Sequence, residues 1–414
     1  MLPIILFLAI PVLGFIFAMK DLNDWKSKVV FIAFYTLYGY ALTFEMYKAD
    51  SFRVARLFYF GIWDFAKIIS DYNRGYITDL YRFFVYAIVQ PFTMNPKILY
   101  AVFSFIFGTF ACLSISKLYS IWQGKKTIFF YVIVFLFFLH ITFFNIQTTR
   151  FYTATVIFVY FAIQFFYFHK KLALIGIFAT PYIHFSFFFI VVVTISYIII
   201  SKTRFSKYCY WFYIAAFILS LAKPQTLIDE ALGDEEEQME MTDNSSINRK
   251  IKGYNKSSKN DGPKAEKKVS AYRAANGLFT KATLFIYAWG FVIMSTLFYK
   301  KRKRKEIIQD KTQNNLLNFT FYLFGATTLL KLLISNGGRF NYCADMLMMF
   351  WLCSVFQKNE SVRWKDYVIM FLPIKFYYIA FFFFNAPRPV AHMFWWATPI
   401  STILDGIGFV PDFL

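Results

Sequence analysis

His184 is the residue whose position in the sequence most favours chemistry. It stands in residues 181–186, PYIHFS, where Pro181 is expected to interrupt an apolar segment. An ionisable side chain at membrane depth is a functional candidate by default. An imidazole that titrates near neutral pH could remove a proton from a sugar hydroxyl as a general base. The alternative is a packing residue that is satisfied by a hydrogen bond.

Two arginines could bind a phosphate group beside this histidine. Arg150 opens an apolar segment after residues 147–149, QTT, and Arg339 follows two glycines in residues 335–342, SNGGRFNY. The paired glycines allow a tight turn, and the planar guanidinium group offers paired N–H donors that match phosphate oxygens. Each arginine could instead anchor a helix end by snorkelling toward lipid headgroups. Two arginines and one histidine on one face would form a site for an anionic leaving group.

Aspartates in residues 45–96 are weaker candidates for binding substrate. Asp50 lies in residues 48–53, KADSFR, and could hold a sugar hydroxyl, act as a base or pair with Arg53. Asp79 follows later in the same segment. We therefore include Asp79 and the Asp50–Arg53 motif among the candidate substrate-binding residues.

Asp345 is a further acidic candidate. It lies about one helical turn beyond Arg339, where it could orient that arginine or begin a span with a satisfied carboxylate. The consecutive carboxylates of residues 234–237, DEEE, stand in a polar stretch and are expected to be solvated rather than to bind a metal. No Walker motif, GxGxxG or HExxH stands at a plausible position. We therefore predict neither a metal site nor any other cofactor.

The apolar segments that must position these residues predict an all-α integral membrane protein. The chain of 414 residues is 58% hydrophobic, with 57 phenylalanines and a mean hydropathy of +0.47. Apolar runs near the length of about 17–25 residues needed to cross a bilayer recur along it, and helices satisfy their own backbone in lipid. The run 2–19 lacks a basic leader and a small-residue cleavage site, so we interpret it as the first span. We predict about twelve transmembrane helices, some of them short, at 2–19, 27–44, 97–119, 127–147, 150–168, 172–183, 184–201, 208–223, 278–299, 316–335, 342–356 and 367–384.

The charge pattern predicts how these spans are oriented. The net charge of +20 arises mostly from short loops between apolar runs, which is typical of membrane orientation and argues against nucleic-acid binding. Six consecutive cations at Lys300–Lys305 are expected in the cytoplasm. Other short basic loops then also fall inside, at 20–28, 124–126, 169–171, 202–207 and 358–365. The candidate residues His184, Arg150 and Arg339 fall on the outer side.

Three long segments are expected on the outer side of this single membrane domain. Charged residues interrupt 45–96, which predicts amphipathic helices on the membrane surface with a re-entrant piece at 83–95. The loop 224–277 is polar and is expected to be mobile. The aromatic tail 385–414 could form an interfacial belt or stack on sugars. Residues 172–201 are predicted to form two short helices with His184 near their turn.

Taken in order, short motifs along the chain resemble the EpsG-type family of bacterial polysaccharide polymerases and, more broadly, Wzy polymerases. The likeness covers residues 1 to about 384 and leaves the loop 224–277 unexplained. The matching motifs are an Asp-x-x-Arg after the second span (Asp50, Arg53), an arginine opening a helix (Arg150), a basic turn (Lys170, Lys171), a His-x-Ser (His184, Ser186) and a late Gly-Arg-x-x-Tyr (Gly338, Arg339, Tyr342).

This resemblance implies a glycosyltransferase of the GT-C type in the bacterial cytoplasmic (inner) membrane. It implies transfer of a polyprenyl-pyrophosphate-linked glycan onto a lipid-linked repeat unit at the outer face, without a metal. Arg150 and Arg339 would hold the pyrophosphate, and His184 would act as base or orient the acceptor hydroxyl. Ser186 and Tyr342 join the candidate substrate-binding residues. The expected partners are the lipid-linked oligosaccharide, membrane lipid and a chain-length regulator.

Two other functions are compatible with the sequence. A flippase for lipid-linked oligosaccharide would need cations along a passage through the bilayer, whereas only Lys331 and Lys375 lie within expected spans away from the residues at their ends. A metal-dependent GT-C transferase that uses a lipid-phosphate sugar donor would need an acidic residue in the first external segment, for which Asp50 is the candidate. The arginines at helix ends favour the external polymerase.

Overall fold

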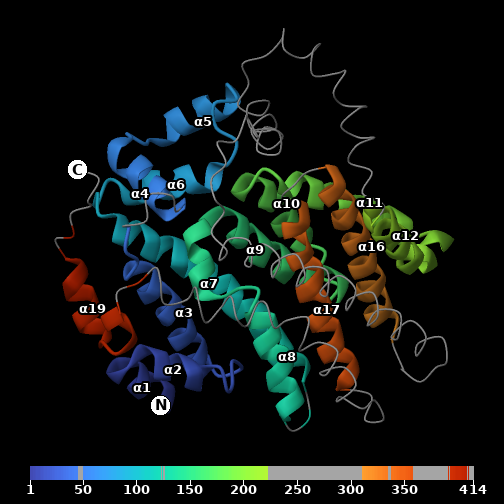
Figure 1. Cartoon of the computed structure of the whole chain (residues 1–414), viewed down its shortest axis with the longest axis horizontal. Coiled ribbons are helices and arrows are strands. Elements are labelled where there is room, and N and C mark those ends of the chain that lie inside the picture. The colour runs from blue at the N-terminus through green and yellow to red at the C-terminus, as the bar shows by residue number, and fades with distance from the viewer. Residues whose placement is uncertain are drawn as a thin grey trace, which may run out of the picture.

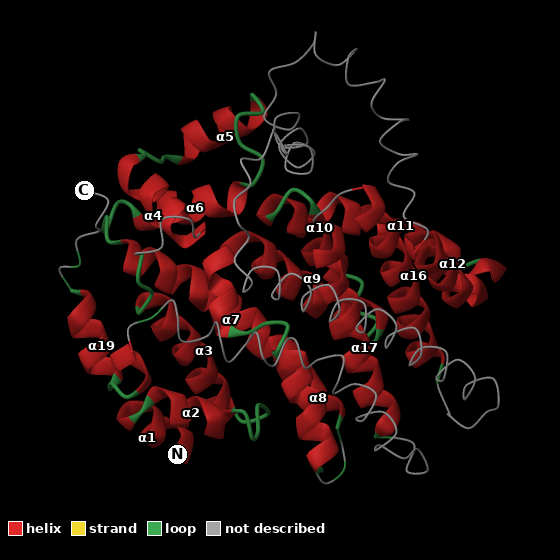
Figure 2. Ribbon diagram, in the orientation of Figure 1, coloured by secondary structure: helices red, strands yellow, loops and turns green. Residues whose placement is uncertain are grey.

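The computed structural model describes residues 1–44, 50–122, 126–221, 310–333, 337–357 and 392–407, with residues 124, 390 and 409. Throughout these residues the regular structure is helical and contains no strand, apart from an isolated antiparallel bridge between Leu42 and Val390. Figure 2 shows this arrangement of helices and loops. The prediction of an all-α protein is confirmed for the described part of the chain.

The first apolar run is not one straight span, so this prediction was wrong. It forms two helices of 8 residues each, α1 (Leu2–Ala9) and α2 (Pro11–Ala18), which pack side by side (Figure 1). Ile10 between them has extended backbone, and Pro11 is suited to begin a helix because its missing N–H needs no partner there. A Cβ added to Gly14 would collide with the backbone of Phe7, so glycine permits the close packing.

The centre of the molecule is built from α3 (Trp25–Tyr40), α7 (Pro96–Ile121), α8 (Ile128–Phe138) and α9 (Thr149–Phe166). Two helical stretches in the described chain are long and apolar enough to cross a membrane, Pro96–Ile121 and Ile128–Phe166, the latter containing α8 and α9. The bent pair formed by residues 187–201 and 204–220 would make a third. The protein is therefore an all-helical membrane protein.

Residues 172–201 form the expected pair of short helices. α10 (Ala173–Ile183) leads to His184, and α11 (Phe187–Ser201) returns from it. Pro181 lies inside α10 rather than at the break. The following helices are η2 (Arg204–Tyr208), α12 (Cys209–Leu221), α16 (Lys311–Leu333), η3 (Gly337–Phe340) and α17 (Asn341–Phe356).

The charged segment after α3 forms three helices that lie together at one edge of the molecule (Figure 1). They are α4 (Asp50–Phe60), α5 (Phe65–Asn73) and α6 (Leu80–Val89). α5 exposes Phe65 and Ile69, as expected of an amphipathic helix on a membrane surface. The apolar helix α6 covers the first part of the segment predicted to be re-entrant.

Several of the basic loops lie together at the end of the bundle remote from His184. Lys126 Nζ is 2.9 Å from Asp21 Oδ1, which joins the loops at 20–28 and 124–126. His169 Nε2 lies 3.0 Å from Thr312 Oγ1, which joins a third basic loop to the start of α16. The chain therefore alternates between a basic end and the end that carries His184.

Several predictions lie outside the described residues. They are the spans at 278–299 and 367–384, the loop 224–277 and the cations Lys300–Lys305. Of the tail 385–414, the structure describes η4 (His392–Trp395) and α19 (Pro399–Gly406). The count of about twelve spans and the GT-C architecture remain predictions.

Candidate functional site

A small polar cavity lies where the charged segment meets the start of α9. Its volume is about 120 Å³. Three helical regions supply its walls: α4, α6, and the passage from η1 (Phe143–Thr148) into α9. Three arginines and one aspartate share this space. The lining residues are Asp50, Arg53, Val54, Arg82, Gln147, Thr148, Thr149 and Arg150.

Arg150 stands in the first turn of α9, where the positive end of the helix dipole disfavours a cation. A buried carboxylate offsets this cost: Arg150 Nη1 donates to Asp79 Oδ2, and the Asp79 side chain is only 4% exposed. The arginine keeps 28% of its surface exposed and also lines the cavity. Helix N-termini and guanidinium groups both favour anions, so the wall formed by Thr148, Thr149 and Arg150 suits a phosphate.

Asp79 connects this arginine to the turn that holds His184. Its Oδ1 accepts a hydrogen bond of 2.8 Å from the backbone N–H of Phe185. One carboxylate, at the residue preceding α6, therefore ties together α6, α9 and the α10–α11 turn. Asp79 was predicted to bind substrate; the structure shows that it contacts Arg150 and positions the turn.

His184 and Ser186 lie together, as the His-x-Ser spacing indicated. Ser186 Oγ is 2.6 Å from His184 Nδ1, and which atom donates depends on the tautomer of the ring. The half-buried imidazole packs edge-on against Phe151, with ring centroids 5.5 Å apart. This contact fixes the ring next to the residue that follows Arg150.

Arg339 reaches the same end of the molecule through its neighbour Phe340. The Phe340 ring lies 5.4 Å from that of Phe151 and 5.4 Å from that of Phe187. Arg150 and Arg339 thus each flank a ring of one aromatic cluster, and His184 packs on the same cluster. The Arg339 side chain is exposed.

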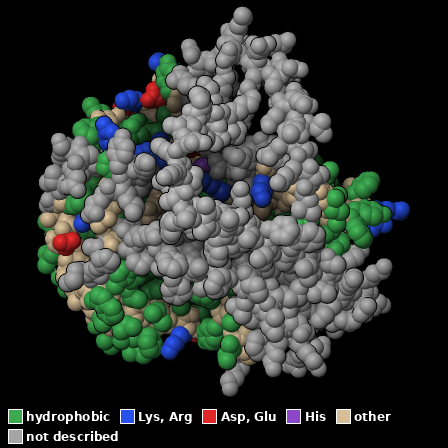
Figure 3. All heavy atoms as spheres, viewed as in Figure 1, with side chains coloured by type: hydrophobic (Ala, Val, Ile, Leu, Met, Phe, Trp, Pro, Cys, Tyr) green, Lys and Arg blue, Asp and Glu red, His purple; other side chains and the backbone are tan. Residues whose placement is uncertain are grey.

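The three predicted catalytic residues therefore lie around one aromatic cluster, but they do not share the cavity. Arg150 lines it, whereas His184 and Arg339 lie outside its walls. Figure 3 shows cationic side chains and a histidine on one face of the molecule. Tyr342 lies between the site and the interior, because its ring is 5.9 Å from that of Tyr152, the second residue after Arg150, and 5.7 Å from that of His140.

Asp50 and Arg53 pair with each other, which is one of the three roles that the sequence allowed for Asp50. Arg53 Nη2 donates to Asp50 Oδ1 at 2.6 Å, with the side chains 69% and 39% exposed. Both residues line the cavity. An exposed pair of this kind contributes little to stability, so it is able to exchange its partner for a ligand.

Arg82 is the one charged residue of the cavity wall, among those described, that was not a candidate from the sequence. Its Nε is buried and has no hydrogen-bond partner among the described residues, and its guanidinium carbon lies 4.6 Å from the centre of the Phe83 ring. A buried donor without a partner is costly, which favours an anion in the adjoining cavity. A signal was present, because Asp79-x-x-Arg82 repeats the spacing of Asp50-x-x-Arg53.

Asp345 lies in the interior rather than in the cavity. Its Oδ2 is 3.4 Å from His140 Nε2, and both side chains are fully buried. His140 Nδ1 lies 2.9 Å from the carbonyl oxygen of Leu136. The expectation that Asp345 meets a substrate finds no support in this location, because the carboxylate pairs with His140.

No family model, curated protein or solved structure matches this chain. The fold and the site define its class as an all-helical membrane protein with a cationic cavity at the His184 end. Its function must be inferred from the chemistry of that site.

Proposed function

We propose that this protein is a polymerase of a surface polysaccharide in the bacterial cytoplasmic membrane. It transfers a polyprenyl-pyrophosphate-linked glycan onto a lipid-linked repeat unit at the outer face. The observation that carries the proposal is the cavity lined by Arg53, Arg82 and Arg150, tied through Asp79 to the turn of His184.

The proposed reaction uses these cations to stabilise a leaving group. The acceptor hydroxyl oxygen forms a bond to the anomeric carbon of the donor glycan, and the bond from that carbon to the pyrophosphate oxygen breaks. The oxygen leaves with the electron pair, and preorganised guanidinium groups stabilise the negative charge that develops on it. The products are the elongated lipid-linked glycan and a polyprenyl pyrophosphate.

His184 would receive the proton of the acceptor hydroxyl. In the tautomer in which Nδ1–H donates to Ser186 Oγ, Nε2 carries no proton and is the nitrogen proposed to accept the proton of the hydroxyl. The Asp79 carboxylate fixes the turn through the backbone of Phe185, which keeps the base close to the arginine that binds the leaving group. Such positioning of base and leaving group supplies much of the catalysis in transfer reactions.

The test is polymerisation by the purified protein. Synthetic polyprenyl-pyrophosphate repeat units are supplied in nanodiscs, and product lengths are resolved by electrophoresis. We expect a ladder from the native protein, and only single repeat units from Arg150→Ala, His184→Ala and Arg339→Ala. Polymer of native length from all three variants would refute the proposal.

Two controls make this test specific. Arg74→Ala removes an exposed arginine that stands in a third Asp-x-x-Arg motif, Asp71-x-x-Arg74, but does not line the cavity. We expect this variant to polymerise normally. Parallel reactions with EDTA identify the metal-dependent transferase, because loss of the ladder in EDTA would favour that mechanism over stabilisation by arginine alone.

A further inference from the structure

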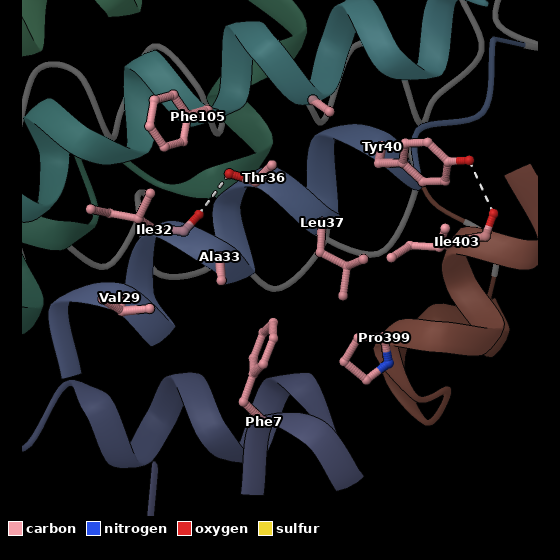
Figure 4. A pocket seen from close by; sticks show the side chains of 11 residues that line it. Phe7, Val29, Ile32, Ala33, Thr36, Leu37, Tyr40, Phe105, Pro399 and Ile403 are labelled. Atoms are coloured by element: carbon pink, nitrogen blue, oxygen red, sulfur yellow. Dashed lines mark hydrogen bonds between the residues drawn. The ribbon is translucent and has the colours of Figure 1, made fainter. Parts of the chain in front are cut away.

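A second, apolar cavity lies between α1, α3, α7 and α19 on the other side of α7 from the arginines. Its volume is about 570 Å³. Figure 4 shows side chains from these four helices around it. We call it the apolar groove. Its lining residues are Phe7, Val29, Ile32, Ala33, Thr36, Leu37, Tyr40, Ala101, Phe105, Pro399 and Ile403.

The polar groups in the wall of the apolar groove are already satisfied. Thr36 Oγ1 donates to the carbonyl oxygen of Ile32 at 2.9 Å, and Tyr40 Oη donates to that of Ile403 at 3.0 Å (Figure 4). None of the described residues that line the wall has a charged side chain. A ligand therefore gains from this surface only by burying hydrocarbon.

The groove is open to the side. Val29 and Phe105 line it and are 50% and 52% exposed. α19, which forms one wall, also exposes Ile400 and Leu404 on its outside. In a membrane protein, surfaces of this kind face lipid, so a chain could enter the groove from within the bilayer.

The groove runs away from the end of the molecule that carries the cationic cavity. Tyr40 is the last residue of α3, and the chain continues from it toward α4 and Asp50. Val29 lies near the other end of α3, about 16 Å from Tyr40 along the helix axis. The tail of a lipid whose headgroup is held in the cavity would thus meet the groove at its Tyr40 end. From there the groove continues along α3 toward Val29.

α7 lies between the two sites. One face of this helix lines the groove, and the opposite face packs on α6, which lines the cationic cavity. Ala101 and Phe105 line the groove. Phe103 packs on Tyr86 of α6 with ring centroids 6.4 Å apart, and Tyr86 Oη donates to the carbonyl oxygen of the cavity residue Val54 at 3.0 Å. The cationic cavity and the apolar groove therefore flank the first three turns of one helix.

α19 is held in place as a wall of the groove. Asn95 Nδ2, just before α7, donates to the carbonyl oxygen of Gly406 at 3.1 Å, and Lys97 Nζ lies 3.9 Å from Asp405 Oδ2. A Cβ on Gly406 would collide with the Tyr40 ring. The close approach of α19 to α3 thus depends on this glycine.

We propose that the apolar groove holds the isoprenoid chain of the lipid-linked substrate. This inference rests on the proposed function, since it assigns the tail of the molecule whose pyrophosphate the arginines bind. The occupant follows from the pairing of an uncharged groove, whose polar groups are already hydrogen-bonded, with a cavity of three arginines that lies beyond the opposite face of α7. Both features match a single ligand that has a pyrophosphate head and a long hydrocarbon tail.

Binding of two pyrophosphates of different chain length tests this assignment. The probes are a long-chain polyprenyl pyrophosphate and geranyl pyrophosphate, titrated against the full-length protein in nanodiscs. Ala33→Trp and Ala101→Trp fill the groove, and we expect each to weaken binding of the long-chain probe about tenfold while sparing the short one. Val192→Trp on α11, which is exposed but outside the groove, should bind both probes as the native protein does.

Photocrosslinking of the native protein provides a measurement that does not depend on folding of the variants. A long-chain probe with a photoreactive tail should label peptides that contain residues 29–40 and 101–105, and excess phospholipid should not displace it. Labelling elsewhere, displacement by phospholipid, or an equal loss of both probes in the tryptophan variants would overturn the groove assignment. If the tail labels the groove but the native protein forms no polymer, the groove assignment stands and the proposed polymerase activity is refuted.

Discussion

Two motifs with the same spacing, Asp50-x-x-Arg53 and Asp79-x-x-Arg82, behave differently in this molecule. In the first, the two residues pair with each other at 2.6 Å on the surface of α4. In the second, Asp79 is buried and pairs with Arg150, 71 residues away, while Arg82 lines the cavity with its Nε lacking a partner in the described structure. Burial, rather than spacing, therefore decides which partner each aspartate takes.

The difference separates residues that build the site from residues that can respond to a ligand. An exposed pair is screened by water and gains little, about 0–1 kcal/mol. Breaking a buried pair leaves an uncompensated charge and costs about 3–5 kcal/mol. Asp79 should accordingly hold the architecture by its pairing with Arg150, whose exposed part still lines the cavity. Arg82 and Arg53 do not build the fold and should remain available to bind an anion.

Replacing Asp79 is expected to have the largest effect. Asp79→Asn removes the charge that compensates Arg150, and since Arg150 is 28% exposed we expect the lower limit, a loss of about 3 kcal/mol. Thermal unfolding in detergent measures this loss, with Asp50→Asn as the matched control. Adding Arg150→Gln to Asp79→Asn should recover part of the stability but no polymer. Equal unfolding temperatures for both single variants would contradict the comparison.

Arg82→Ala should separate activity from stability. Because the Nε of Arg82 is buried without a partner among the described residues, its removal should leave the unfolding temperature unchanged or raise it. Binding of inorganic pyrophosphate should weaken by about 1.5–3 kcal/mol, the usual contribution of a hydrogen bond to a charged group. Isothermal titration measures this loss. We expect Arg82→Lys to bind pyrophosphate with an affinity between those of the native protein and Arg82→Ala. Unfolding of Arg82→Ala at a markedly lower temperature would show instead that Arg82 is structural.

The sequence predicted the positions of the helices better than it predicted the contacts between distant parts of the chain. Apolar runs located α7, α9 and α11 to within a few residues, because each helix must bury or expose hydrocarbon along its whole length. The fold-back of α1 on α2 depends on a tertiary contact between Gly14 and Phe7, which hydropathy does not report. The connection of Asp79 to Arg150 and to Phe185 joins distant parts of the chain, so spacing alone could not predict it.

In the candidate site, too, the sequence indicated some residues and could not indicate others. Arg150, His184 and Arg339 were recognisable because each stands at the end of an apolar run, and their common aromatic cluster brings them to one end of the fold. Arg82 stands inside an apolar helix, where an arginine resembles an interface anchor. Only the cavity reveals that its side chain faces two other arginines.

Arg53→Ala should weaken pyrophosphate binding less than Arg82→Ala does. Arg53 is 69% exposed and already pairs with Asp50. Water and the aspartate therefore both reduce the free energy that Arg53 can contribute to binding a ligand. We expect a loss of about 0.2–1 kcal/mol that disappears at high salt, because exposed charges are screened. Titrations at low and high ionic strength measure it. A loss as large as that of Arg82→Ala and insensitive to salt would place Arg53 in direct, desolvated contact with the anion.

Arg74→Ala, in the third Asp-x-x-Arg motif, should have the smallest effect of all. Arg74 follows the last residue of α5, is exposed and does not line the cavity. Its charge lies at the carboxyl end of α5, and a favourable interaction of a cation with the helix dipole there is worth about 0.3–1 kcal/mol at low salt. Pyrophosphate affinity should match that of the native protein within error. A loss comparable to that of Arg53→Ala would mean that the whole charged segment attracts the ligand through its summed field, and that the cavity does not select among the three motifs.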